Sequence, residues 1–173
     1  PDKPENEKIN KLHEDPTMCV FTLTEGSLRS GVSFNSMPQE TDFVPTNNVQ
    51  KIIWQVEKGE NFKIGEEGLS KFVVKSIKTN PNVVYSLRID YYNAKGEPMN
   101  HQFFENEQDK IHQHFFMYYT NNGAHNVLVK NREELPYEYT YADSYKGKFI
   151  GESNPMGFFG FIRFLQPDTK FDL

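Results

Sequence analysis

The feature that most constrains this chain is a two-residue alternation of apolar and polar side chains, repeated along most of its length. The clearest example is residues 83–91, where every second residue is large and apolar: Val83, Tyr85, Leu87, Ile89 and Tyr91. Successive side chains of a β-strand point to opposite faces, so this spacing puts all five on one face. The segment predicts a strand, and Gly96 in the NAKGEP stretch that follows predicts the tight turn of a hairpin.

Similar short apolar stretches are separated by Gly, Asn, Pro and Asp residues, which are typical of turns. Further strands are predicted within residues 18–26, 49–64, 69–77, 109–120, 137–143 and 157–165, with residues 58–60 as the turn of a second hairpin. Many short strands with turns between them favour an all-β fold, an antiparallel β-sandwich with Greek-key-like connections. A small closed β-barrel is the alternative.

Length and composition indicate the domain organisation, and the charge distribution argues against one class of protein. The chain has 173 residues, which is typical of one domain. Residues 1–16 are polar and rich in proline, so they predict a flexible N-terminal tether before a single domain at residues 17–173. An apolar pattern that starts at Phe171 and Leu173 suggests that the domain lacks its last strand. The net charge of −5 has no basic cluster, which argues against nucleic-acid binding.

Catalytic motifs are weak in this sequence. Cys19 is the only cysteine, so the chain has no internal disulfide and no cysteine-based zinc motif. Its position inside an apolar strand predicts a small buried side chain. No G-x-S-x-G nucleophile motif occurs, and the acidic run at residues 105–109 is typical of a solvated loop. The sequence therefore predicts a protein that is not an enzyme.

Two histidines are the strongest candidates for ligand binding. His112 and His114 fall on the same face of the predicted strand, about 7 Å apart along it. His101 lies just before this strand and would come alongside if the two segments paired, which gives a third ligand. Imidazole groups suit zinc or another divalent metal ion, and haem is the second cofactor considered. The alternative is an exposed polar face, with the other side chains turned inward: Ile111, Phe115, Met117 and Tyr119.

A second candidate site is aromatic. Tyr137, Tyr139 and Tyr141 alternate along one strand and so share a face. Such a row suits an aromatic platform for a ligand such as a carbohydrate, or ordinary packing across neighbouring strands. The sequence leaves both interpretations open.

Several short motifs occur in a characteristic order, mainly in the second half of the chain: Gly96-Glu97, His112-Gln113, Phe115-Phe116, Asp143 and Pro155-Met156-Gly157. In this order they resemble small secreted surface lipoproteins of Bacteroidetes bacteria. The resemblance implies an immunoglobulin-like β-sandwich, anchored to the membrane only through a lipid on an N-terminal cysteine and associated with TonB-dependent outer-membrane uptake systems.

The function that this resemblance implies is that of a ligand-binding accessory lipoprotein of the cell envelope, at the outer-membrane surface or in the periplasm. With the histidines, it predicts capture of a metal ion or haem for a TonB-dependent receptor. The alternative is a structural or protein–protein interaction module with no small ligand.

Overall fold

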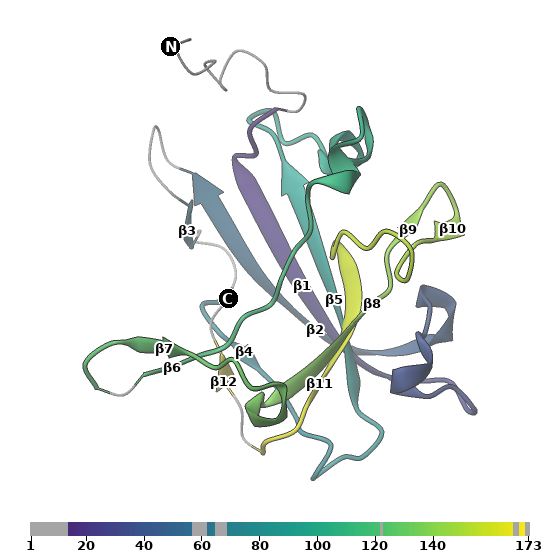
Figure 1. The fold of residues 1–173 in the computed structure, drawn as a ribbon, viewed down its shortest axis with the longest axis vertical. Helices are drawn as coiled ribbons and strands as arrows, with labels where there is room; N and C mark the ends of the chain where they lie inside the picture. Colours follow the sequence, from purple (N-terminus) through teal and green to yellow (C-terminus); the bar gives the residue numbers. More distant parts are fainter. Residues whose placement is uncertain (1–13, 57–61, 65–68, 122, 168–169, 172–173) are drawn as a thin grey trace.

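A computed structural model describes residues 14–56, 62–64, 69–121, 123–167 and 170–171 of the chain. The described residues form a six-stranded antiparallel sheet in the order β3–β2–β1–β5–β11–β8 (Figure 1). Its strands are β1 (Met18–Leu28), β2 (Phe43–Val56), β3 (Phe62–Ile64), β5 (Val84–Tyr92), β8 (Tyr137–Tyr141) and β11 (Phe159–Phe164).

Short elements surround this sheet. Three antiparallel pairs are formed by β4 (Phe72–Val73) with β12 (Lys170–Phe171), β6 (Tyr119–Asn121) with β7 (Asn126–Leu128), and β9 (Ser144–Tyr145) with β10 (Lys148–Phe149). The helical elements are single 3-10 turns: η1 (Phe34–Ser36), η2 (Glu40–Asp42), η3 (Asn100–Phe104), η4 (Gln108–Lys110) and η5 (Arg132–Glu134). In the described part of the chain, no helix has the length and apolar character needed to cross a membrane.

The predicted all-β, antiparallel fold is confirmed, and its layers are sandwich-like. The large sheet forms one layer, and the short strands, 3-10 turns and loops pack over its faces. The edge strands β3 and β8 each pair with one neighbour among the described residues, so the sheet there is open and does not form the closed barrel considered as the alternative.

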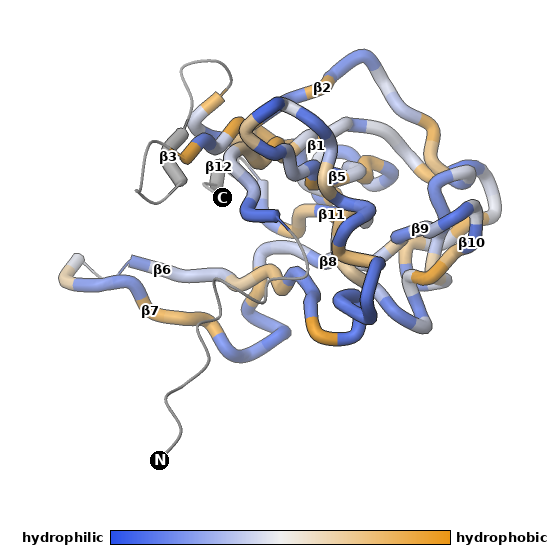
Figure 2. Tube along the Cα trace, turned by 90° about the horizontal axis from the view of Figure 1, so that it is seen from above, coloured by the Kyte–Doolittle hydropathy of each residue, from blue (hydrophilic) through white to orange (hydrophobic). Residues whose placement is uncertain are grey.

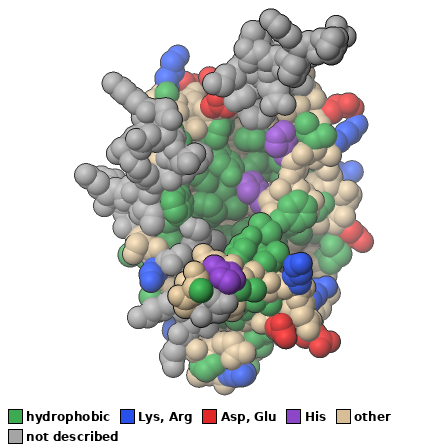
Figure 3. Space-filling model, turned by 60° about the vertical axis from the view of Figure 1, so that its left-hand side comes forward, with side chains coloured by type: hydrophobic (Ala, Val, Ile, Leu, Met, Phe, Trp, Pro, Cys, Tyr) green, Lys and Arg blue, Asp and Glu red, His purple; other side chains and the backbone are tan. Residues whose placement is uncertain are grey.

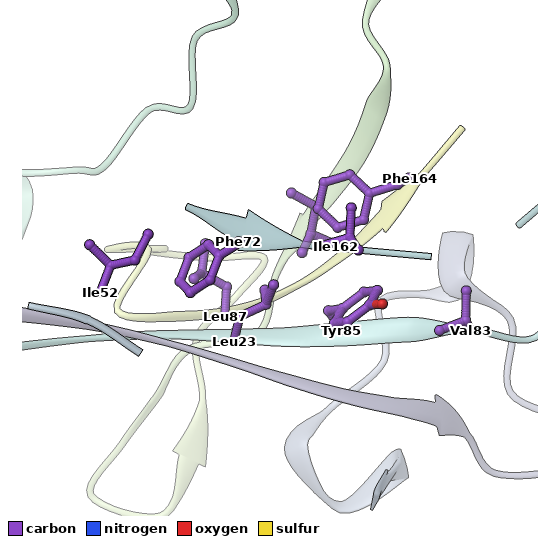
Figure 4. Close-up of a cluster of buried hydrophobic side chains, with 9 residues drawn as sticks. Leu23, Ile52, Phe72, Val83, Tyr85, Leu87, Ile162 and Phe164 are labelled. Atoms are coloured by element: carbon purple, nitrogen blue, oxygen red, sulfur yellow. The ribbon is translucent and has the colours of Figure 1, made fainter. Parts of the chain in front are cut away.

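One face of the sheet carries the main hydrophobic core. Leu23 of β1 lies opposite Leu87 of β5, and Tyr85 of β5 lies opposite Ile162 of β11. Figure 4 shows these side chains gathered together, with Phe72 of β4 packed onto them from the covering layer. Tyr85, Leu87 and Ile89 are almost fully buried, as predicted, and Val84 and Ser86 on the other face of this strand are buried as well. On the opposite face, Phe34 of η1 packs with Val84 of β5 and with Phe159 and Phe161 of β11 in a second cluster.

The predicted hairpin after β5 forms its turn but not its second strand. Gly96 has a φ of 77°, a left-handed conformation that favours glycine, and Tyr92 makes an isolated bridge to Pro98. The chain then coils into η3 instead of continuing as a strand. The strand predicted at residues 69–77 is also reduced to the two residues of β4.

A further departure lies at residues 111–118, which we call the strap. The sequence predicts a strand here, but the strap is an extended segment outside any β-ladder. Figure 1 shows it running from η4 across the sheet to β6, and Figure 2 shows the β6–β7 hairpin projecting beyond the sheet. Because the strap crosses a face of the sheet instead of following an edge, its peptide groups cannot form a regular ladder.

Parts of the sequence-based organisation fall on residues outside the described ranges. These are residues 1–13 of the predicted tether, the turn at residues 58–60, and residues 172–173 at the predicted C-terminal strand. Glu14, at the end of the predicted tether, exchanges hydrogen bonds with Gln102 of η3.

Candidate functional site

The strap keeps the predicted alternation but has the opposite face inward. The four side chains predicted to be buried are exposed: Ile111 (73%), Phe115 (70%), Met117 (62%) and Tyr119 (49%). His112 and His114, predicted to form the outer polar face, are half-buried, and Phe116 packs against the main core. The phase prediction was therefore wrong. It assumed that the larger apolar set seeks the core, whereas hydrogen bonds to the sheet decide which set turns inward.

His114 anchors the strap to the loop before β11. Its backbone N–H and its ring Nδ1 both lie 2.8 Å from the carbonyl oxygen of Met156, and its Nε2 lies 2.8 Å from the hydroxyl of Tyr91. A carbonyl oxygen only accepts, so Nδ1 must carry the ring proton. Nε2 of the neutral ring then accepts a hydrogen bond from Tyr91. This geometry defines one tautomer and leaves neither ring nitrogen for a metal ion.

Burial controls the protonation of this cluster. Burial lowers the pKa of His114, against the opposing effects of its bond to Met156 and the charge of Asp143. Beyond Tyr91 lies the thiol of Cys19, whose pKa burial raises to about 12. A thiol with such a pKa is protonated at neutral pH, so Cys19 is not an activated nucleophile. The prediction that it is a small buried side chain is confirmed.

The three predicted metal ligands have separate environments. His101 lies exposed on η3, and the Nδ1 of His112 lies 2.9 Å from the carbonyl oxygen of Gln108. Residues 97–104 do not pair with the strap, so His101 is not brought alongside the other two. Within the described ranges, no three or more His, Cys, Asp or Glu side chains are grouped so that they could hold a metal ion.

Asp143 holds the loop to which the strap is anchored. This side chain is 2% exposed, and its carboxylate accepts hydrogen bonds from the backbone N–H groups of Gly157, Phe158 and Phe159. The carbonyl that binds His114 belongs to the preceding residue, Met156. Two of the motifs that carry the resemblance, Asp143 and Pro155-Met156-Gly157, therefore meet in space, beside His114 of the strap, which lies between two others.

Two tyrosines of β8 donate hydrogen bonds to backbone carbonyls of the strap. The hydroxyl of Tyr141 donates to the carbonyl of His114, and that of Tyr137 donates to the carbonyl of Phe116 at 3.0 Å. Between them the Tyr139 ring packs against Phe116, with 4.4 Å between ring centroids. The row of tyrosines predicted to share one face does so. The hydroxyl groups of Tyr137 and Tyr141 bond to the strap, whereas the buried hydroxyl of Tyr139 has no hydrogen-bond partner among the described residues.

Beside these contacts the strap and β8 border an open pocket of about 820 Å³. Its aromatic wall consists of Phe115, Phe116, Tyr137, Tyr139 and Tyr141. Leu135 and Leu165 add apolar surface, and Asn131, Arg132 and Glu133 add polar groups from the loop that carries η5. Figure 3 shows hydrophobic side chains gathered across a face of the molecule, with histidine side chains among them.

Only part of this pocket is recognisable from the sequence. The tyrosines were recognisable from their alternation, but Arg132, Asn131 and Leu165 carry no local pattern that marks them. They reach the pocket because the chain leaves the sheet at the strap, forms the β6–β7 hairpin and returns through η5 to β8. A signal in the sequence was the unusual density of aromatic residues in 115–119 and 137–141.

Comparison of the chain with protein-family models, with curated proteins and with solved structures found no match. The geometry of the strap, the tyrosines and the pocket therefore carries the functional argument.

Proposed function

We propose that this protein is a non-catalytic binding protein whose ligand occupies the pocket between the strap and β8. The observation that carries the proposal is the pocket itself: about 820 Å³ of space lined by five aromatic side chains. Small-molecule sites typically occupy roughly 300–1,000 Å³, with apolar walls and a few polar groups that orient the ligand. The side chains of the pocket match this composition.

Polar groups at the rim are available to a ligand. The guanidinium of Arg132 makes no hydrogen bond or ion pair with any other described residue. The Oδ1 of Asn131 accepts from the backbone N–H of Glu133, which leaves its amide NH₂ as a donor. An organic ligand with flat apolar surfaces and polar edges would therefore find both kinds of contact.

A metal ion has less support as the cargo. Both ring nitrogens of His114 are hydrogen-bonded, and among the described residues no histidine, cysteine or methionine lines the pocket. An organic ligand uses the surfaces that the pocket provides. We carry the cell-envelope location and the TonB-dependent uptake partner into this proposal from the sequence resemblance, in which the pocket would hold the cargo for delivery.

The test is a thermal-shift and calorimetric screen of four probes: zinc chloride, haem, an oligosaccharide set and an end-blocked peptide set. The informative variant is Phe115→Ala, because this side chain lines the pocket and is 70% exposed, so its loss leaves the fold intact. Ile111→Ala is the matched control, since this residue is 73% exposed on the same strap but does not line the pocket.

We expect an organic probe to bind the wild type and Ile111→Ala, with binding weakened about tenfold or more in Phe115→Ala. Equal binding in all three proteins, or no organic binding, would contradict the pocket as the site. Zinc binding that survives Phe115→Ala but disappears in the His112→Ala/His114→Ala double variant would instead support the metal site predicted from the sequence.

The alternative function, a protein–protein interaction module, is favoured by one observation. Large apolar side chains are exposed along the strap and the adjoining hairpin: Ile111, Phe115, Met117, Tyr119 and Val127. Exposed apolar side chains that form a patch commonly mark a surface to which a second protein binds.

A further inference from the structure

The outer edge of β8 forms one border of the pocket, and its hydrogen-bonding pattern can be derived from its flanks. The backbone N–H of Leu165 donates to the carbonyl of Pro136, and the N–H of Ala142 donates to the carbonyl of Phe159. In an antiparallel pair the peptide groups of alternate residues point toward the partner strand. Even-numbered residues of β8 therefore bond to β11, and the peptide groups of residues 137, 139 and 141 point away from it.

Two of these three residues have open peptide groups. At residue 141 the edge is obstructed, because a Cβ placed on Gly151 would lie 2.5 Å from the carbonyl oxygen of Tyr141. The backbone N–H and C=O groups of Tyr137 and Tyr139 make no hydrogen bond within the described part of the chain. Both residues line the pocket. Two backbone donors and two backbone acceptors, at the spacing of a β-strand, are therefore open on residues that line the pocket.

An unpaired edge is usually protected by a proline, an inward-pointing charge, a bulge or a covering segment. β8 has the sequence Tyr-Glu-Tyr-Thr-Tyr, and its one charged side chain, Glu138, is bound to Arg163 of β11. Nothing in the strand itself blocks pairing at Tyr137 and Tyr139. Such an edge beside an apolar pocket is the arrangement by which proteins bind an extended peptide as an added strand.

We propose that the ligand of the pocket is an extended polypeptide segment of a partner protein, which pairs with Tyr137 and Tyr139 as an additional strand next to β8. This inference rests on the proposed function and names its ligand class. Alternate side chains of the segment pack against Phe115, Phe116 and Leu135, so these positions are apolar. The rim carries both signs of charge, at Arg132 and Glu133, so binding depends only weakly on salt.

A polypeptide fits this edge better than a carbohydrate does. Peptide groups repeat donors and acceptors at about 3.3 Å per residue, in register with the open groups of β8. Sugar hydroxyl groups can bond to the same atoms but have no matching repeat. Oligosaccharide binding is therefore the competing outcome of the test.

The experiment uses ¹⁵N-labelled protein and three end-blocked hexapeptides that alternate threonine with valine, leucine or phenylalanine. We expect the amide signals of Tyr137 and Tyr139 to shift and their hydrogen exchange to slow on titration. Each peptide is also prepared in two forms, N-methylated at every threonine or at every apolar residue. Only one of these sets points its N–H groups at β8, so only one form should lose about tenfold or more in affinity.

The outcomes separate this inference from the proposed function. Equal loss in both N-methylated forms would show binding without strand pairing and would overturn the inference. Binding of cellohexaose with sensitivity to Phe115→Ala, and no peptide binding, would keep the pocket as the site but overturn the ligand class. If neither the peptides nor the sugar perturb the pocket residues, the inference fails; if haem also leaves them unperturbed, the proposed function fails with it.

Discussion

Replacement of Asp143 by asparagine gives the sharpest test of how the site is built. The carboxylate accepts from the N–H groups of Gly157 and Phe158 at 2.9 and 2.8 Å and from Phe159 at 3.3 Å. Oδ2 serves the first bond and Oδ1 serves the other two. An amide has the same shape but only one acceptor atom, so Asp143→Asn cannot retain all three bonds.

The cost follows from the better of two orientations of the amide. With its oxygen in place of Oδ1, the amide keeps two bonds, but its NH₂ group then faces the N–H of Gly157 as donor to donor. One charge-assisted bond is lost and a buried N–H is left without an acceptor, which costs about 2–4 kcal/mol. Asp143→Ala leaves all three N–H groups without acceptors and costs about 3–5 kcal/mol or more.

The assay is urea unfolding followed by the fluorescence of Trp54, the single tryptophan, which packs against the main core. With a denaturant slope of about 2 kcal/mol/M, Asp143→Asn should lower the midpoint by about 1–2 M. Asp90→Asn in β5 is the control: no hydrogen bond involves its carboxylate in the described structure, so a change within about 0.5 kcal/mol is expected. A similarly small change for Asp143→Asn would refute this account of the loop.

Three further predictions concern the strap and the buried thiol. Burial lowers the pKa of His114, so the unfolded chain binds more protons than the folded protein below about pH 6.5. The free energy of unfolding should therefore fall on acidification from about pH 7.5 to 5.5. The fall should be smaller in His114→Gln, and an identical fall in this variant would contradict the prediction. Gly157→Ala should destabilise the protein in urea unfolding by about 1–3 kcal/mol more than Gly31→Ala. Both glycines have positive φ, but of the two only Gly157 would place the new Cβ against another side chain, 2.8 Å from the Cβ of His114. Equal losses in the two variants would show that this contact is unimportant. Cys19 should resist a thiol reagent in the folded protein and react on unfolding, because it is buried and its pKa is about 12. Rapid labelling of the native protein would disprove this prediction.

The strands of the large sheet were predictable because their signal is local. In β5 the large apolar side chains of Tyr85, Leu87 and Ile89 alternate along one face of a paired strand, and in β1 Cys19 and Leu23 are buried on a shared face. A strand paired on both sides has its faces set by the sheet, so the period and the phase agree. The turn at Gly96 was predictable for a similar reason, since it depends on the backbone of one residue.

The candidate site was only partly predictable. The alternation in the strap gave the correct period, yet the apolar set at Ile111 and Phe115 faces solvent while His114 faces the sheet. The reversal arises because the partners of His114 are Tyr91, which lies 23 residues before it, and Met156, which lies 42 residues after it. No local pattern contains these bonds.

The sequence by itself determined the all-β class, the main strands and the buried character of Cys19, because each depends on short-range periodicity or composition. Only the tertiary structure decided which face of the strap is buried, that three histidines have separate environments, and that residues of the strap, the η5 loop and β8 border one pocket with Leu165. The physical reason is that these features depend on hydrogen bonds and packing between segments far apart in the chain, and on which peptide groups of β8 the fold leaves unpaired.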